Sequence, residues 1–203
     1  MFRHLLVPLD GSRLAESVMS AVHHFNEQLD AEVTLLHIVE RNAPRTVHGQ
    51  PHLSSSQDAE KYLADLAQRT LPPERQTKQH VHVNETADVA RSIVAHAEEL
   101  RVDLIILCAH GAGGLRHGIF GTVAQRVIGL GTRPVLLVPA VPHAGDKGFA
   151  CRRLLVPLDG NPEHEQGLTL LPHLGSGSAQ QVELLLVVPT WRHAKSASLV
   201  TSR

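Results

Sequence analysis

Two short segments of the sequence have residue types that could bind a ligand, one through a carboxylate and the other through a glycine-rich loop. The first is residues 8–12, PLDGS, directly after an apolar run, and the second is residues 108–114, CAHGAGG, after another apolar run. Gly121-Thr122 then opens an amphipathic stretch. Glycines let a ligand approach the backbone closely, and the amides at a helix N-terminus favour an anion. The glycine-rich segment therefore predicts a phosphate-containing ligand, and Asp10 could accept hydrogen bonds from a ribose hydroxyl or a base.

Each segment also has a purely structural interpretation. Asp10 and Ser12 can cap the first helix, and the glycine-rich loop can be a flexible turn between a strand and a helix. No Lys follows the glycines at 111–114 and no GxGxxG follows the first apolar run, so neither segment is a P-loop or a dinucleotide fingerprint. We therefore expect binding rather than strong phosphoryl transfer, and we assign no catalytic residue.

Short apolar runs alternate with longer amphipathic stretches, which is typical of βαβ units that build a parallel sheet. The predicted strands are residues 3–9, 32–39, 77–83, 103–108 and 134–139. The predicted helices are residues 13–29, 56–70, 86–101 and 121–130. Ser12 and Thr86 are the predicted N-caps of the first and third helices. Residues 40–56, rich in Pro, Gly and Ser, predict a mobile surface loop.

Right-handed crossovers between these elements favour an α/β fold with a doubly wound five-stranded parallel sheet in the order 3-2-1-4-5. Ligands in such sheets bind beyond the carboxyl ends of the strands where the winding reverses, here between the first and fourth strands. That position brings the Asp10 segment and the glycine-rich segment together. Polar and apolar residues alternate at 80–83, which predicts that the third strand lies at an exposed edge.

The sequence contains an internal repeat. Residues 5–11, LLVPLDG, return unchanged as residues 154–160, an offset of 149 that also aligns 33–39 with 182–188. We expect a nucleotide-binding domain at 1–140, a linker at 141–150 and a partial second repeat at 151–203. One βαβ unit buries little apolar surface. The second repeat is therefore expected to pack on something else, or the chain is a fragment of a longer tandem protein.

Composition excludes several classes of function. The net charge is −1, with 19 Lys and Arg against 20 Asp and Glu, which argues against nucleic-acid binding. Two cysteines cannot form a disulfide framework, and no apolar run reaches the ~20 residues of a membrane span. No signal-peptide pattern precedes Pro8. We expect a cytoplasmic protein without membrane contact, and no metal site, because the 15 histidines are scattered without an HExxH pair.

Three parts of the sequence resemble the universal stress protein family: the PLDGS segment, residues 36–39 (LHIV), and the run from His110 to Val138. The resemblance spans about residues 2–140 and restarts at 152, as in tandem members of that family. ATP-binding members carry the pattern G-x2-G-x9-G-[ST], and Gly111, Gly121 and Thr122 match its last three elements. Cys108 replaces the first glycine, so we expect weakened ATP binding.

The resemblance implies a ligand of ATP, with or without Mg²⁺. Adenine and ribose would contact the ends of the first two strands, and the phosphates would contact the glycine-rich segments. The candidate binding residues are Pro8, Leu9, Asp10, Ile38, Cys108, His110, Gly111, Gly121, Thr122 and Val123. His110 either touches the ligand or orients the loop. The Cys108 thiol is either a small apolar residue at a strand end or a redox sensor.

The leading functional hypothesis is a stress-response module whose nucleotide occupancy alters dimer or partner contacts. A non-nucleotide interaction scaffold of the same fold is the alternative, because the family has members without the phosphate motif. A slow ATP hydrolase is a further alternative that lacks an obvious general base. We also predict a homo-oligomer paired through Val135, Leu136, Leu137 and Val138, since this edge strand is too apolar for water and family members commonly join there.

Overall fold

The structure, a computed structural model, describes residues 2–109, 121–139, 149–165, 167–169, 171 and 181–187. The chain divides into two compact units, Met1–Ala150 and Cys151–Arg203, and each is treated by itself below. The candidate site lies in the first unit.

All five predicted strands of the first unit form one parallel sheet. These strands are β1 (His4–Pro8), β2 (Glu32–Glu40), β5 (Thr77–Thr86), β6 (Leu104–Cys108) and β7 (Val135–Val138). Their spatial order is β5-β2-β1-β6-β7, which is the predicted 3-2-1-4-5 order, and every adjacent pair is parallel. The predicted fold class is therefore confirmed. The prediction that the third strand lies at an edge is also confirmed.

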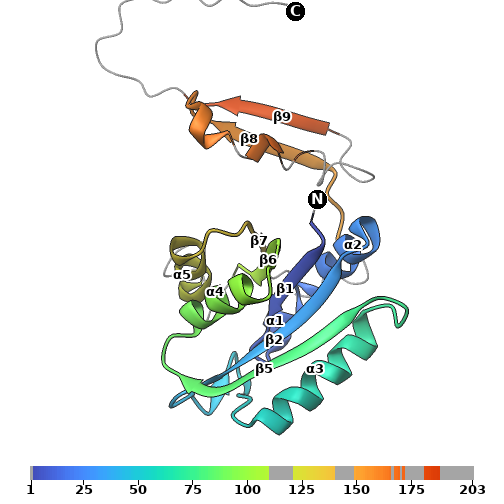
Figure 1. The fold of residues 1–203 in the computed structure, drawn as a ribbon, viewed down its shortest axis with the longest axis vertical. Coiled ribbons are helices and arrows are strands. Elements are labelled where there is room, and N and C mark those ends of the chain that lie inside the picture. Colours follow the sequence, from blue (N-terminus) through green and yellow to red (C-terminus); the bar gives the residue numbers. More distant parts are fainter. Residues whose placement is uncertain are drawn as a thin grey trace, which may run out of the picture. The chain divides into compact units, whose positions relative to one another are not determined.

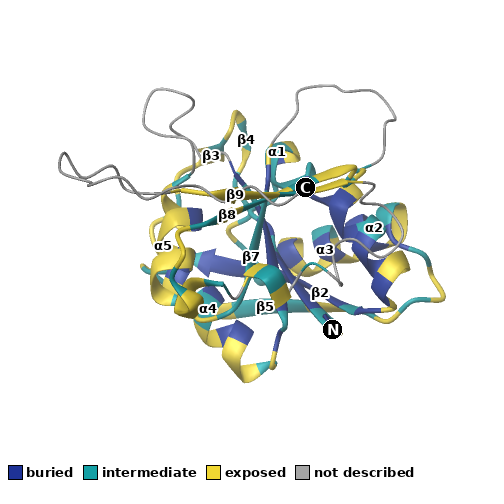
Figure 2. Ribbon diagram, turned by 90° about the horizontal axis from the view of Figure 1, so that it is seen from above, coloured by how far each residue is buried: buried dark blue, intermediate teal, exposed yellow. Residues whose placement is uncertain are grey.

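Helices cover both faces of this sheet, with α2 and α3 on one face and α4 and α5 on the other (Figure 1). The helices of the unit are α1 (Arg13–Glu16), α2 (Met19–Leu29), α3 (Ser56–Thr70), α4 (Val89–Glu99) and α5 (Thr122–Leu130). Leu5, Leu6 and Val7 of the central strand are completely buried between these layers. Figure 2 shows the buried strands between helices whose outer faces are exposed. Burial of each such side chain contributes about 2 kcal/mol.

The prediction of one continuous helix at 13–29 is wrong. The chain forms two helices there, α1 and α2, with a tight turn between them. The Ser17 hydroxyl donates to the Leu14 carbonyl at 2.7 Å, and the Ser17 amide donates to the same carbonyl at 3.2 Å. Such local bonds compete with the regular helical ladder. Ser12 is an N-cap as predicted, since its hydroxyl accepts from the Ala15 amide at 3.1 Å.

The predicted N-cap at Thr86 is also wrong. Thr86 is the last residue of β5 and pairs with Glu40, so the strand is longer than predicted. Asp88 caps α4 instead, accepting from the Arg91 amide at 3.0 Å, while the Thr86 hydroxyl accepts from the Asp88 amide at 3.1 Å. Asp binds the free amides of a first turn at least as well as Thr does.

The segment predicted as a mobile loop, residues 40–56, contains a short antiparallel hairpin. Its strands are β3 (Thr46–Val47) and β4 (Gln50–Pro51). His48 and Gly49 at the turn both have positive φ, at 50° and 76°. These left-handed conformations match the twist of a two-residue hairpin turn. The hairpin is too short for its pattern to show in a single sequence.

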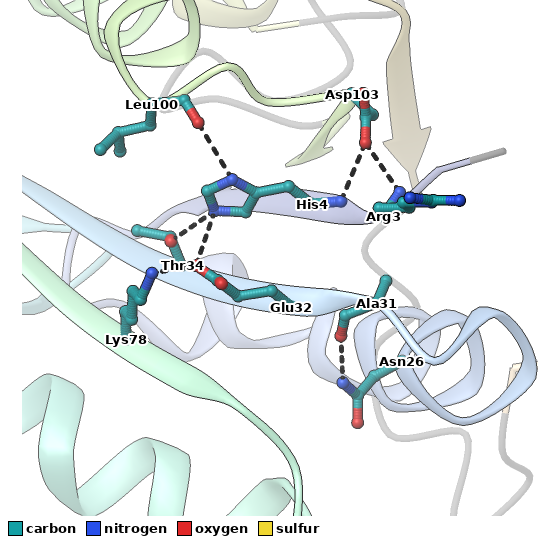
Figure 3. Close-up of polar contacts among 9 residues, drawn as sticks. All are labelled: Arg3, His4, Asn26, Ala31, Glu32, Thr34, Lys78, Leu100 and Asp103. Carbon is teal, nitrogen blue, oxygen red and sulfur yellow. Dashed lines mark hydrogen bonds and ion pairs between the residues drawn. The ribbon is translucent and has the colours of Figure 1, made fainter.

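Polar contacts join the strands near their amino ends (Figure 3). The Asp103 carboxylate accepts from the backbone amides of Arg3 and His4 at 2.7 and 3.0 Å. The His4 ring reaches the Leu100 carbonyl at 3.1 Å and the Thr34 hydroxyl at 2.7 Å. These contacts tie β1 to β2 and to the turn before β6. At this end of the sheet, polar groups of the strands and of the turn before β6 therefore bind one another.

The second unit contains a parallel pair of strands, β8 (Arg153–Leu158) and β9 (Gln181–Leu186), and a 3-10 turn, η2 (Pro162–His164). Arg153 pairs with Gln181 as His4 pairs with Glu32, so the strand register repeats with the same offset of 149 as the sequence. Most of the apolar side chains of β9 are exposed, whereas those of β2 are buried.

Candidate functional site

A cavity of about 460 Å³ opens at the carboxyl ends of β1, β2 and β6. Eight of the sequence-predicted residues line it: Pro8, Leu9, Asp10, Ile38, Cys108, Gly121, Thr122 and Val123. The other two, His110 and Gly111, lie outside the described residues. The doubly wound topology explains why these residues lie together. The winding of the sheet reverses between the adjacent strands β1 and β6, so the loops that follow them leave a crevice between them.

The turn after β1 orients Asp10 at the cavity. Gly11 has φ +86°, and a Cβ there would lie 2.7 Å from side-chain carbons of Leu53, so the position favours glycine for both reasons. One carboxylate oxygen of Asp10 accepts from the Ser12 amide at 2.9 Å. Asp10 therefore stabilises the turn and also lines the cavity. The structural and the ligand-binding interpretations of Asp10 are compatible.

His37 on β2 forms part of the cavity wall, although it was not a candidate from the sequence. Its ring is buried, with Nδ1 2.8 Å from the Leu9 carbonyl oxygen and Nε2 3.3 Å from the Leu53 carbonyl oxygen. Burial lowers the pKa of His37, against the opposing effect of these two carbonyls. A neutral imidazole has one N–H and donates to only one of these two carbonyls; the shorter contact is to Leu9, after the end of β1.

The hairpin segment supplies another wall that sequence reasoning missed. The cavity is lined there by Pro44, Val47, His48 and His52, together with Glu40 at the end of β2. His52 Nε2 lies 3.8 Å from a carboxylate oxygen of Glu40. No periodic pattern marks residues 40–56 in the sequence, so only the folded hairpin identifies these residues as neighbours of the cavity.

The first turn of α5 forms the opposite side. Gly121 is the N-cap of α5, and its amide donates to the Ala109 carbonyl at 2.9 Å. Its φ of −64° is open to any residue, so glycine is not required here for its backbone geometry. What glycine provides here is the absence of a side chain at the cavity. Thr122 and Val123 follow at the start of the helix and line the cavity with it.

Arg126 provides a positive charge at the same place. Its guanidinium donates to a carboxylate oxygen of Asp88 at 2.7 Å. The Arg91 amide donates to the other oxygen at 3.0 Å. The bond from the Arg91 amide and the nearby Arg126 charge lower the pKa of Asp88. The pair therefore stays ionised near neutral pH and joins the start of α4 to the first turns of α5.

Cys108 ends β6 at the cavity and is half-buried. Its Sγ lies 3.8 Å from the hydroxyl oxygen of Ser17, which donates to the Leu14 carbonyl at 2.7 Å. The side chain thus stands where the family pattern has glycine, beside the turn between α1 and α2.

A larger depression of about 590 Å³ at the amino ends of the strands is a poorer candidate. Charged and polar side chains dominate its lining, and two of them, Arg75 and Asp30, pair with each other. A nucleotide base needs apolar walls. The cavity at the carboxyl ends has them, from Leu36, Ile38 and Leu107.

Three histidines that are scattered in the sequence meet between β5 and α4. The His96 ring is 4.7 Å from that of His80 and 5.0 Å from that of His82, centroid to centroid. Burial, and then the two neighbouring histidines, lower the pKa of His96. Within the described part of the chain, however, no three His, Cys, Asp or Glu side chains are grouped as metal ligands would be. Over the same residues, no helix has the length and apolar character of a membrane span.

Comparison with known sequences gives a consistent result. A family model described as the universal stress protein family matches residues 1–139. Universal stress protein Sll1654 from Synechocystis is 31% identical over 140 residues, which cover 68% of this chain and 87% of the relative. Universal stress protein YxiE from Bacillus subtilis is 27% identical over 147 residues, which cover 68% of this chain and 99% of the relative.

Solved structures share the fold at lower sequence identity. The protein MJ0577 of Methanocaldococcus jannaschii superposes with a TM-score of 0.56 at 24% identity, covering 70% of this chain and 99% of that chain. A universal stress protein in complex with cAMP has a TM-score of 0.51 at 15% identity, covering 69% and 98%. A putative universal stress protein from Pseudomonas aeruginosa has a TM-score of 0.60 at 16% identity, covering 92% and 60%. At these identities the likeness shows the fold.

Proposed function

Because the chain belongs to the universal stress protein family, we propose that its first unit binds an adenine nucleotide in the cavity at the carboxyl ends of β1, β2 and β6. The observation that carries the proposal is the meeting of three features in one cavity. Apolar walls suit a base, Asp10 suits a ribose, and the first turn of α5 with Arg126 suits a phosphate. The complex of a family member with cAMP supports the same ligand class.

Occupancy of this cavity would act through contacts with a second copy or a partner. The start of α5 lines the cavity, and β7 follows α5 at the edge of the sheet. Val135, Leu136 and Leu137 of β7 are only half-buried. We therefore retain pairing of two β7 strands as the proposed oligomer contact. Leu136→Lys should shift the protein toward monomers in light scattering, and a monomeric wild type at micromolar concentration would contradict the contact.

Calorimetric titration of the full chain with ATP, ADP, AMP, cAMP and adenosine tests the ligand. At least one of them should bind with micromolar affinity, and Gly121→Val should weaken that binding about tenfold or more, because its side chain would project at the cavity. Gly129→Val is the matched control, since a Cβ at Gly129 meets nothing within 4 Å. Unchanged affinity in folded Gly121→Val, or no binding of any of the five ligands, would refute the proposal.

An interaction scaffold that binds no nucleotide is the second candidate, and Cys108 is the observation that favours it. A side chain at this family-pattern glycine reduces the space for a ligand. Cys108→Gly should strengthen nucleotide binding several-fold, because it removes the thiol that reduces the space for a ligand. Thermal unfolding shows whether the added flexibility of glycine disturbs the end of the strand. A flat or lower affinity in a variant of unchanged thermal stability would show that Cys108 is no obstacle.

A further inference from the structure

Arg126 is the one Lys or Arg among the described residues that line the cavity, which also has the carboxylates of Asp10 and Glu40. A ligand with several phosphate charges would enter a site where these acids oppose it. The amides at the start of α5 supply only a partial positive charge. A guanidinium supplies a full one, with five N–H donors in a fork that matches phosphate.

Asp88 limits how much of that charge is available. It is held in place as the N-cap of α4 through one carboxylate oxygen, and its other oxygen accepts from Arg126 at 2.7 Å. Arg126 is half-exposed, at 54% of its side chain, so other groups can approach its remaining N–H groups. A phosphate in the cavity would therefore compete with a fixed carboxylate for one guanidinium.

We propose that Arg126 selects the phosphorylated form of the ligand by binding its phosphate, and that Asp88 weakens this selection by competing for the same guanidinium. This inference rests on the proposed function. It predicts that the effect of substituting either residue on ligand affinity increases with the phosphate charge of the ligand. Neither should matter for a nucleoside, whose base and ribose would lie against the apolar walls and Asp10.

Two single variants separate the roles. Arg126→Gln should lower the affinity for ATP about tenfold and change that for adenosine less than about twofold, because a charge-assisted bond to phosphate is lost. Asp88→Asn should raise the affinity for ATP about threefold. Asn caps a helix as well as Asp does, so α4 keeps its first turn while the competing charge is removed.

Arg91→Gln is the matched control. Arg91 also lies near Asp88, with Nε 3.5 Å from the same carboxylate oxygen, but it does not line the cavity. Its removal should change the affinity for ATP less than about twofold. Raising the salt concentration should reduce the effect of Arg126→Gln, because the cavity is open to solvent ions.

The outcomes distinguish this inference from the proposed function. Equal losses of ATP and adenosine affinity in Arg126→Gln, no loss of either, or a lower ATP affinity in Asp88→Asn would overturn the inference while the binding site stands. No binding of any nucleotide or nucleoside to the wild type would overturn both. If Arg126→Gln does not fold, Arg126→Lys decides, since it keeps the charge without the fork and should lose ATP affinity only about threefold.

Discussion

The two copies of the LLVPLDG segment have the same local structure but opposite burial. In both, an aspartate oxygen accepts from the amide two residues later at 2.9 Å, from Ser12 in the first copy and from Asn161 in the second. The intervening glycines have φ of +86° and +79°. Yet Leu6 is fully buried, whereas the equivalent Leu155 is 60% exposed. Local sequence therefore determines the strand and turn, and burial comes from the neighbouring elements.

The polar contact between the first two strands of each copy shows the same contrast. His4 and Thr34 share a part-buried hydrogen bond of 2.7 Å. The equivalent residues, Arg153 and Glu183, form an exposed ion pair of 2.8 Å. The contact of the first copy lies in a partly covered part of the sheet, where polar groups need hydrogen-bond partners. A charged contact suits a pair of strands that solvent reaches.

Truncation of the equivalent leucines should give the largest difference between the copies. Leu6→Ala should lower the free energy of unfolding by about 3 kcal/mol, because it leaves a cavity in a packed core. Leu155→Ala should change it by less than about 0.5 kcal/mol, since that side chain is already mostly in solvent. Urea unfolding followed by circular dichroism measures both. Similar losses in the two variants would mean that Leu155 is covered in solution.

The pH dependence of stability should show the next largest difference. Burial lowers the pKa of His37, while the equivalent residue of the second copy is Leu186. Below about pH 6.5 the unfolded state therefore binds more protons than the folded state. The stability that neutral His37 contributes is complete above that pH and is lost as the pH falls. His52 and Asp10 near His37 oppose each other, since His52 lowers its pKa and Asp10 raises it.

His37→Leu, which copies the second repeat, should therefore flatten the stability profile between pH 5 and 7 by thermal unfolding, measured against the wild type. His96 also has a lowered pKa, mainly from burial, so some slope should remain. The double variant His37→Leu, His96→Gln should be flatter still. An unchanged slope in both variants would mean that these imidazoles are not the groups whose protonation destabilises the fold.

Substitutions in the polar contacts between strands should give the smallest effects. Thr34→Val keeps the shape but removes the hydroxyl that meets His4, and should cost about 1 kcal/mol because the partly buried ring nitrogen loses its shorter polar contact. Glu183→Gln should cost less than about 0.5 kcal/mol, as exposed ion pairs contribute little. Chemical unfolding at low and high salt measures both. A larger loss for Glu183→Gln would reverse the comparison.

Much of the first unit was predictable because its signals are local. Apolar runs, turn residues and the handedness of crossovers are enough to predict the strands, their order and the edge position of β5. The same reasoning placed Pro8 and Asp10 at the carboxyl end of the first strand and Gly121 at the start of a helix, and all three line the cavity. The errors included the continuity of the first helix, where Ser17 makes local bonds to the Leu14 carbonyl, and the hairpin within residues 40–56.

What the tertiary structure alone decided are the contacts between residues far apart in the chain. His37 and the hairpin residue His48 line the cavity, and Arg126 forms an ion pair with Asp88. No spacing in the sequence records these contacts, because each depends on where two separate elements pack. The sequence by itself determined the turn and strand of each repeat, since backbone geometry and neighbouring residues suffice for them. Whether such a strand becomes a core or an exposed ribbon depends on what covers it.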